Sequence, residues 1–282
     1  MLVSSSLPFS KDGFIVEVCN IKPGHPIWAD LVSTNLEASK KFYGELFGWT
    51  YEGSEDEYGN YTTAFLNGKR VAALYPHVPE MGGVPNVWTV YLATTDIHET
   101  AAKVEAAGGT SLYPPMHVEP YGWMGGFQSP GGEMVGAWQP ESHPGFEVLA
   151  EPGAIAWLEA ITKNFDAAKA FYEAAFGWTT DIMSDTDEFR YATLERGPEA
   201  AAGLMDGSTF LEDAVPGFWQ IYINVESVDE TVAKLESLGG SVLEAAADTN
   251  FGRIAFVTDS TGARFRLQQH VEGATYEADT AE

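Results

Sequence analysis

The sequence predicts an α+β protein in which one domain occurs twice, and two repeated landmarks carry this prediction. Residues 42–50, FYGELFGWT, return as FYEAAFGWT at residues 171–179 of the 282-residue chain. A strand-like run from Trp88 and a helix-like run that closes at Gly108-Gly109 return as the runs from Trp219 to Gly239-Gly240. Two landmarks that recur in the same order after roughly 130 residues indicate an internal duplication.

Each copy is expected to begin with a strand and a helix. Residues 27–32 alternate as a strand does, and Thr34-Asn35 offers an N-cap for a helix over residues 36–47. Gly48 follows where helices commonly end in a left-handed glycine. Three strand-like runs, separated by turns that contain Gly, Asn or Asp, then cover residues 49–52, 61–66 and 71–75.

The second half of the copy repeats this order. A strand over residues 88–93 precedes a helix over residues 96–107, and further strands fall near residues 111–113, 123–128 and 134–138. The chain is therefore predicted to contain four strand-helix-strand-strand-strand (βαβββ) units, which begin near Ile27, Val87, Ile155 and Phe218.

These units divide the chain into two modules with short additions. The predicted parts are an N-terminal leader (1–25), a first module (26–140), a linker rich in Pro and Gly (141–153), a second module (154–271) and an acidic tail (272–282). Because one chain already holds four units, a monomer is expected by default, and a homodimer remains open.

Composition excludes several classes of partner. The chain carries 41 acidic and 15 basic residues, a formal net charge of −26, and such a field repels nucleic acid and anionic membranes. Its one cysteine, Cys19, excludes an intrachain disulfide. Residues 1–14 lack a secretory signal pattern, and no apolar run is long enough to span a bilayer. A cytoplasmic protein is expected.

The repeated motifs resemble those of the vicinal oxygen chelate superfamily, which holds glyoxalase I, extradiol dioxygenases, fosfomycin-modifying enzymes and bleomycin-binding proteins. The matching features are Phe-Tyr ahead of Phe-Gly-Trp in each copy, at residues 42–49 and 171–178, and the module endings at residues 129–140 and 259–269. Over residues 26–270 the chain is most similar to two-module actinobacterial proteins described as glyoxalase-like. The resemblance implies two curved mixed sheets, each forming a cup with helices on its convex face and a ligand on its concave face.

The alternation of the first strands agrees with such cups. Ile27, Ala29 and Leu31 share an apolar face suited to packing, whereas Trp28 and Asp30 lie on the opposite face. In the second copy, Trp157 and Glu159 hold the corresponding ligand-facing positions.

The resemblance also implies where metal ligands would lie, and this sequence departs from the family there. The metal enzymes use a histidine on the first strand, a histidine or glutamine on the fifth and a glutamate on the last. The corresponding residues of the two copies are Trp28 and Trp157, Thr89 and Gln220, and Gly136 and Arg266. An indole N–H has no lone pair for a metal, and a cation opposes metal binding. No metal and no cofactor are therefore predicted.

A relocated metal site stays an alternative. His25 and His77 border the first cup, although no third ligand is evident. His117 and Glu119 lie two residues apart in a proline-rich loop, where a surface pair is the simpler interpretation.

Two acids are the candidate catalytic residues. Asp30 and Glu159 occupy the same position of the two copies, and a carboxylate among aromatic groups would have a raised pKa and could act as a general base. The alternative is that each pairs with a nearby donor, which for Glu159 would be Arg264 or Arg266.

Aromatic residues suggest flat walls for a planar ligand. In the first cup these are Trp28, Tyr91, Trp123 and Trp138, although strand packing would explain them equally well. The full set of predicted ligand-binding residues comprises Trp28, Thr89, Tyr91, Trp123, Met134, Trp138, Trp157, Gln220, Tyr222 and Arg266. If one cup binds, the first is favoured, because it is the more aromatic and apolar.

Three functional hypotheses follow. The first is a metal-independent protein that binds a small aromatic or polycyclic metabolite. The second is an enzyme, either a metal-independent lyase, isomerase or hydroxylase-like catalyst that uses Asp30 as base, or a glyoxalase-type metalloenzyme with a relocated metal. The third is an interaction protein whose own side chains fill both cups, which predicts no cavity of ligand size.

Overall fold

The computed structural model describes residues 22–53, 59–78 and 82–269. The first copy consists of β1 (Pro26–Ser33), α1 (Leu36–Phe47), β2 (Thr50–Gly53), β3 (Thr62–Leu66), β4 (Lys69–Pro76), β5 (Val87–Ala93), α2 (Ile97–Ala106), β6 (Thr110–Ser111), β7 (Met116–Val118), β8 (Gly122–Gln128) and β9 (Met134–Pro140). The second copy consists of β10 (Ile155–Thr162), α3 (Phe165–Phe176), β11 (Thr180–Asp185), β12 (Arg190–Leu194), the 3₁₀ turn η2 (Gly197–Glu199), β13 (Ala202–Asp206), β14 (Phe218–Asn224), α4 (Val228–Ser237), β15 (Ser241–Thr249), β16 (Gly252–Thr258) and β17 (Arg264–Gln269).

Each copy forms its own mixed sheet. The strand orders are β2-β3-β4-β1-β5-β9-β8-β6, with β7 beside β8, and β11-β12-β13-β10-β14-β17-β16-β15. The first strands of the two units in a copy pair antiparallel, β1 with β5 and β10 with β14. The four units therefore pair within each copy, a point that the sequence left open.

The helix boundaries follow from the capping residues that the sequence predicts. Asn35 accepts a hydrogen bond from the backbone N–H of Ala38 at the start of α1, and Asn164 caps α3 in the same way. Gly48 and Gly177 end these helices with φ of 78° and 71°, a left-handed conformation that glycine adopts without a steric penalty. The predicted end of the first helix at Gly48 is confirmed, and the matching helix of the second copy ends in the same way at Gly177.

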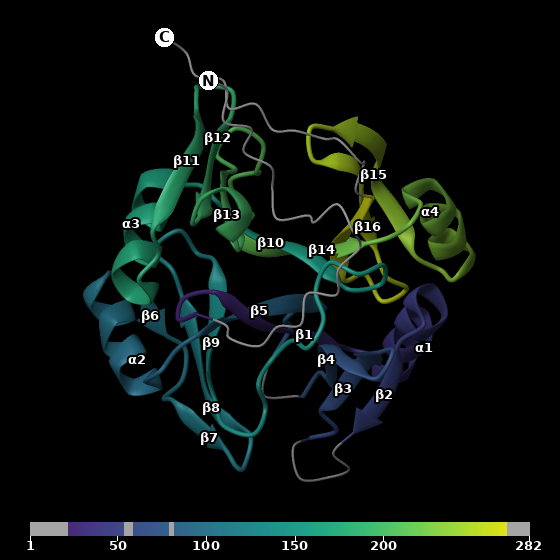
Figure 1. Cartoon of the computed structure of the whole chain (residues 1–282), viewed down its shortest axis with the longest axis horizontal. Coiled ribbons are helices and arrows are strands. Elements are labelled where there is room, and N and C mark those ends of the chain that lie inside the picture. The colour runs from purple at the N-terminus through teal and green to yellow at the C-terminus, as the bar shows by residue number, and fades with distance from the viewer. Residues whose placement is uncertain (1–21, 54–58, 79–81, 270–282) are drawn as a thin grey trace.

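The two sheets lie back to back, with helices along two sides (Figure 1). Strands β5 and β14 meet at the centre, α2 packs against α3, and α1 packs against α4. The predicted packing face is confirmed, because Ile27, Ala29 and Leu31 are buried in the core. Trp88 of the neighbouring β5 lies edge-on to the buried Tyr43 of α1, with ring centroids 5.7 Å apart. The opposite faces of the two sheets turn away from each other and form the two cups. We call the face with Trp28 and Asp30 the first cup and the face with Trp157 and Glu159 the second cup.

The repeated Phe-Gly-Trp motif ties the copies together. The indole N–H of Trp49 donates to the carbonyl of Gly153, at 2.8 Å, just before the second module begins. The indole N–H of Trp178 donates to the carbonyl of Gly24, at 2.9 Å, just before the first. Both tryptophans are buried, so each repeat contributes a hydrogen bond that satisfies a carbonyl of the other copy.

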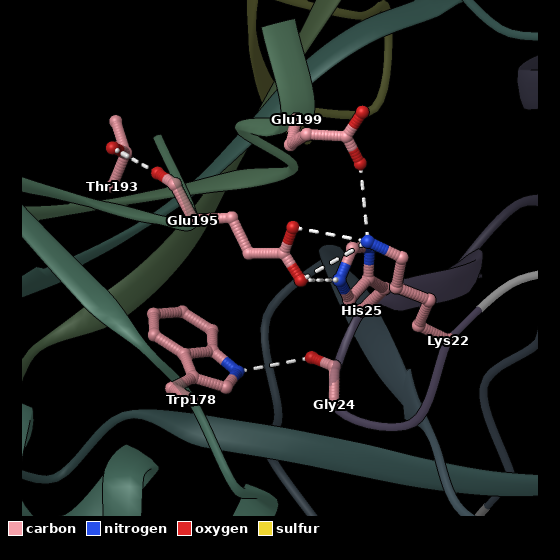
Figure 2. Close-up of polar contacts among 7 residues, drawn as sticks. All are labelled: Lys22, Gly24, His25, Trp178, Thr193, Glu195 and Glu199. Atoms are coloured by element: carbon pink, nitrogen blue, oxygen red, sulfur yellow. Dashed lines mark hydrogen bonds and ion pairs between the residues drawn. The ribbon is translucent and has the colours of Figure 1, made fainter. Parts of the chain in front are cut away.

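A polar cluster lies beside the second of these hydrogen bonds (Figure 2). Lys22 contacts Glu195 and Glu199, each at 3.1 Å, and His25 contacts Glu195 at 3.2 Å. Burial acts to raise the pKa of Glu195, but hydrogen bonds from Lys22 and His25 outweigh it and lower the pKa. His25 thus faces a carboxylate at the junction of the modules.

The predicted linker 141–153 contributes to the core, because its Phe146 and Val148 are buried there. The proline-rich stretch around His117 is not purely a loop, since Met116–Val118 pairs with β8. Cys19, most of the leader and the acidic tail lie outside the described residues. In the part of the chain that is described, no helix is long and apolar enough to cross a membrane.

Candidate functional site

The second cup encloses a cavity of about 340 Å³. Its aromatic walls come from Trp157 on β10, Phe189 and Tyr191 at β12, Tyr222 on β14 and Phe251 before β16. The charged groups on its lining are Glu159, Glu244 and Arg266. The cavity lies within the size range of small-molecule sites, so this cup has room for a ligand, contrary to the hypothesis that both cups are filled.

Glu159 lies at the floor of this cavity with two tyrosine partners. The hydroxyl of Tyr191 donates to Oε2 at 3.0 Å, and the hydroxyl of Tyr222 donates to Oε1 at 2.5 Å. Only 2% of Glu159 is exposed. Burial raises the pKa of this carboxyl, while Tyr222, Tyr191 and the charge of Arg266 partly oppose the shift.

A tryptophan fixes the orientation of this group. The indole N–H of Trp157 donates to the hydroxyl of Tyr191 at 2.9 Å, which leaves the Tyr191 proton directed to Glu159. The result is a hydrogen-bonded chain from Trp157 through Tyr191 to Glu159 that holds the carboxyl in one position.

The first cup contains the same arrangement. Trp28 donates to the hydroxyl of Tyr61 at 2.8 Å, and Tyr61 donates to Asp30 Oδ2 at 3.1 Å. Tyr91 lies directly across from Trp28, as Tyr222 lies across from Trp157. Burial raises the pKa of Asp30 to about 7, although the hydroxyls of Tyr91 and Tyr61 oppose the shift.

Sequence reasoning missed Tyr61 and Tyr191, which connect tryptophan and acid in each cup. Their signal was present, because the two tyrosines are 130 residues apart and both lie at the start of the third strand of a unit, Tyr61 just before β3 and Tyr191 as the second residue of β12. Among the described residues, Glu159 forms no salt bridge with Arg264 or Arg266, the partners that the alternative named; Glu159 and Asp30 accept hydrogen bonds from tyrosine hydroxyls instead. Arg266 instead pairs with Glu244, at 3.1 Å.

The two cups differ in what surrounds this shared arrangement. In the first cup, the ring of Tyr113 lies over Gly126, where a Cβ would meet it at 2.6 Å, and the ring of Tyr91 lies over Gly136. The matching positions of the second sheet hold Phe256 and Arg266, paired with each other across β16 and β17. The sequence favoured the first cup, whereas the cavity described above lies in the second.

His143, which belongs to the stretch predicted as the linker, lies against the first cup. Its ring is edge-on to Trp28, with centroids 4.6 Å apart, and its Nδ1 accepts from the backbone N–H of Gly145. Nε2 is buried and has no hydrogen-bond partner. Burial and the charge of Arg70 lower the pKa of His143 to about 4, so the imidazole is neutral near pH 7.

The remaining predicted residues are distributed unevenly. Thr89 and Gln220 lie directly across from Asp30 and Glu159, and the Gln220 amide donates to the carbonyl of Ile221. In the first cup, Trp138 donates to the carbonyl of His143.

Two predicted residues lie away from the closed part of the first cup. Met134 is at its edge, 52% exposed. Trp123 is not brought to the cup, because it packs between His117 and His98 of α2, on the helix side of β8.

The donor set does not fit the metal that this fold family commonly holds. At the first-strand positions, the indole N–H groups of Trp28 and Trp157 are engaged as donors to tyrosine hydroxyls. Gly136 and Arg266 occupy the last-strand positions. Among residues 22–53, 59–78 and 82–269, no three His, Cys, Asp or Glu side chains gather closely enough to hold a metal.

Comparison with known proteins agrees with the duplicated fold. The "Putative glyoxylase CFP32" of Mycobacterium bovis is 36% identical over 250 residues, which covers 87% of this chain and 95% of that protein. The "Anthracycline biosynthesis protein DnrV" of Streptomyces peucetius is 36% identical over 268 residues, with 89% and 95% covered.

Solved structures support the same fold at lower identity. The Mn(II)-bound glyoxalase of Novosphingobium aromaticivorans superposes with a TM-score of 0.63 at 15% identity, covering 93% of this chain and 86% of that one. The 2,2',3-trihydroxybiphenyl 1,2-dioxygenase of Sphingomonas wittichii superposes with a TM-score of 0.60 at 17% identity, with 92% and 93% covered. The family described as the Glyoxalase/Bleomycin resistance protein/Dioxygenase superfamily matches residues 25–136 and 154–267, and the chain therefore belongs to it.

Proposed function

We propose that the protein binds a small planar aromatic or polycyclic molecule in the second cup, without a metal ion. The observation that carries the proposal is the cavity of about 340 Å³, which has aromatic walls and a carboxyl held by two tyrosines. Aromatic rings pack well against Trp157, Tyr191 and Phe251, and Glu159 offers a hydrogen-bond partner to a hydroxyl group of the ligand.

Two further observations support this proposal. The Streptomyces peucetius relative is described as an anthracycline biosynthesis protein, and anthracyclines are polycyclic aromatic compounds. The residues at the family's metal positions include two indoles and a guanidinium, which are poor metal ligands. We infer that the cup binds the organic molecule directly through its side chains.

Filling the cavity should weaken binding. Ala247 is exposed and lines the cavity, so in the Ala247→Trp variant a large side chain would occupy the ligand space without disturbing the buried core. We expect the affinity for 1,8-dihydroxyanthraquinone, measured by isothermal titration calorimetry, to fall at least about tenfold. Ala102→Trp is the matched control, because Ala102 is an exposed alanine of α2 outside the cavity. Equal loss in both variants, or no binding by the wild type, would contradict the proposal.

A second candidate function is metal-independent proton transfer with Glu159 as the general base. The observation in its favour is that a carboxyl with a raised pKa borders the cavity. Sequence reasoning assigned this role to Asp30, but Glu159 is the acid on the lining of the cavity described here.

Glu159→Gln separates the two candidates. If Glu159 is a base, the variant should still bind the ligand but lose roughly 10²–10⁴-fold in turnover. If the protein is a binder, neither form should convert the bound compound, as monitored by liquid chromatography and mass spectrometry. Conversion by both forms at equal rates would exclude Glu159 as the base.

A further inference from the structure

Among the described residues that line the cavity of the second cup, one is a cation. Arg266 of β17 lines the cavity, and its guanidinium lies 4.6 Å from the ring centroid of Phe256 and 5.9 Å from that of Tyr222. Stacking against these two rings holds the planar group in place, so its N–H donors point in fixed directions.

The hydrogen-bonding capacity of Arg266 is only partly used. Its Nη1 donates to Glu244 Oε2 at 3.1 Å, but the Glu244 side chain is 62% exposed, and such pairs are weak because water screens them. The Arg266 side chain is 20% exposed. Its Nε is buried and has no hydrogen-bond partner among the described residues. A ligand in the cavity can contact the exposed part of the guanidinium, where a charged acceptor would compete with the weak, screened pair to Glu244.

An anionic ligand in this cavity would depend on Arg266, because the other charged groups around it are acidic. The other charged groups on the cavity lining are Glu159 and Glu244, and Glu159 already accepts from two tyrosine hydroxyls. The chain as a whole carries a net charge of −26, which repels anions in general. An anionic ligand therefore needs a local cation, whereas a neutral ring does not.

The first cup provides an internal contrast. The residue that takes the place of Arg266 there is Gly136, beside Tyr91 on the neighbouring strand. The two cups share the tryptophan, tyrosine and acid arrangement. They differ in that the second cup has Arg266 where the first has Gly136.

We propose that the second cup selects a planar aromatic molecule that carries an ionised oxygen, a carboxylate or phenolate, and that Arg266 binds this oxygen. The inference rests on the proposed function, since it names the chemical class of ligand for the same cavity. The ligand oxygen takes the place of Glu244 or shares the guanidinium with it, and the rings lie against Trp157, Tyr191 and Phe251. The site is selective because Arg266 is the only cation among the described residues that line this cavity.

A matched pair of probes tests this inference. Anthraquinone-2-carboxylate and anthraquinone-2-carboxamide have the same ring system, but only the first is ionised at pH 8. We expect isothermal titration calorimetry to show that the wild type binds the acid at least about tenfold more tightly, the effect of one charge-assisted hydrogen bond. Arg266→Gln should remove this preference. Glu244→Gln should strengthen binding of the acid about two- to fivefold, because it removes a competing carboxylate.

Control variants make each result decisive. Arg253→Gln removes the same charge from β16, where Arg253 pairs with Asp229 and Asp248 away from the cavity, and it should keep the preference. Arg266→Lys keeps the positive charge, so it should retain part of the preference for the acid. Thermal unfolding of each Arg266 variant would show whether the variant is folded.

The outcomes distinguish the inference from the proposed function. If acid and amide bind with equal affinity and Arg266→Gln binds both as the wild type does, the inference is wrong and the proposed function stands. If neither probe binds to the wild type, the proposed function and the inference are both contradicted.

Discussion

At pH 8 the Asp30→Asn variant should be more stable to unfolding than the wild type, and most of this advantage should be lost at pH 4.5. Asp30 is 3% exposed, and burial raises its pKa from an ordinary 3.8 to about 7. At pH values between these two pKa values, the folded protein keeps a proton on Asp30 that the unfolded chain has lost. Its contribution to stability is therefore complete below pH 3.8 and is lost as the pH rises through 7.

The expected size makes the effect measurable. Each pH unit in this window lowers the free energy of unfolding by about 1.4 kcal/mol, so the full loss is about 4 kcal/mol. Asparagine is neutral at every pH and can still accept a hydrogen bond from Tyr61. In urea unfolding between pH 4.5 and 8, the variant's stability relative to the wild type should rise by about 3 kcal/mol.

A surface acid provides the control for Asp30→Asn. The hydrogen bond from Arg190 lowers the pKa of the exposed Asp166 below its ordinary 3.8, so this acid is ionised in both the folded and the unfolded protein between pH 4.5 and 8. Asp166→Asn should therefore leave the pH dependence of stability in this range unchanged. A stability difference between Asp30→Asn and the wild type that stays constant across this pH range would show that Asp30 titrates as an ordinary acid.

Replacing His143 by asparagine should produce the opposite pH dependence. Burial lowers the pKa of His143 from an ordinary 6.5 to about 4, so the unfolded chain takes up a proton first as the pH falls. The contribution of His143 to stability is complete above pH 6.5 and is lost as the pH falls through 4. The total loss is about 3 kcal/mol.

The comparison with asparagine isolates this titration. The Oδ1 of asparagine can replace Nδ1 as the acceptor for Gly145, but it binds no proton in this range. At pH 7.5 we expect His143→Asn to be less stable than the wild type because packing against Trp28 is lost. That deficit should shrink by about 3 kcal/mol at pH 4.5 in urea unfolding. A deficit that is the same at both pH values would mean that His143 is accessible to protons in the folded protein.

In the wild type, the effects of these two titrations on the free energy of unfolding partly cancel. Between about pH 4.5 and 6.5 Asp30 lowers the stability as the pH rises, and His143 raises it by a similar amount per pH unit. Both groups lie against Trp28 or its tyrosine partner in the first cup. A flat pH profile of the wild type would therefore be compatible with two strongly shifted groups, which only the single variants separate.

The repeat itself was enough to predict the architecture. The duplicated FYGELFGWT motif, the asparagine caps and the glycine helix ends all rest on local chain geometry, which residues close in sequence control. The alternation of Trp28 with Ala29 and of Trp157 with Leu158 has the period of a strand, so the two faces of each first strand could be assigned. These local signals identified Asp30 and Glu159 as buried acids on the cup faces.

The sequence by itself thus determined the two modules, their four units, the family and the acid at the centre of each cup. Only the tertiary structure decided what surrounds those acids. Tyr61 and Tyr191 reach them from strands about 30 residues away, and His143 reaches Trp28 from the linker. Register shifts along β15 place Glu244 beside Arg266, so that the second cup holds a charge pair at its cavity. Such contacts depend on strand register and chain return, which no local pattern of residues specifies.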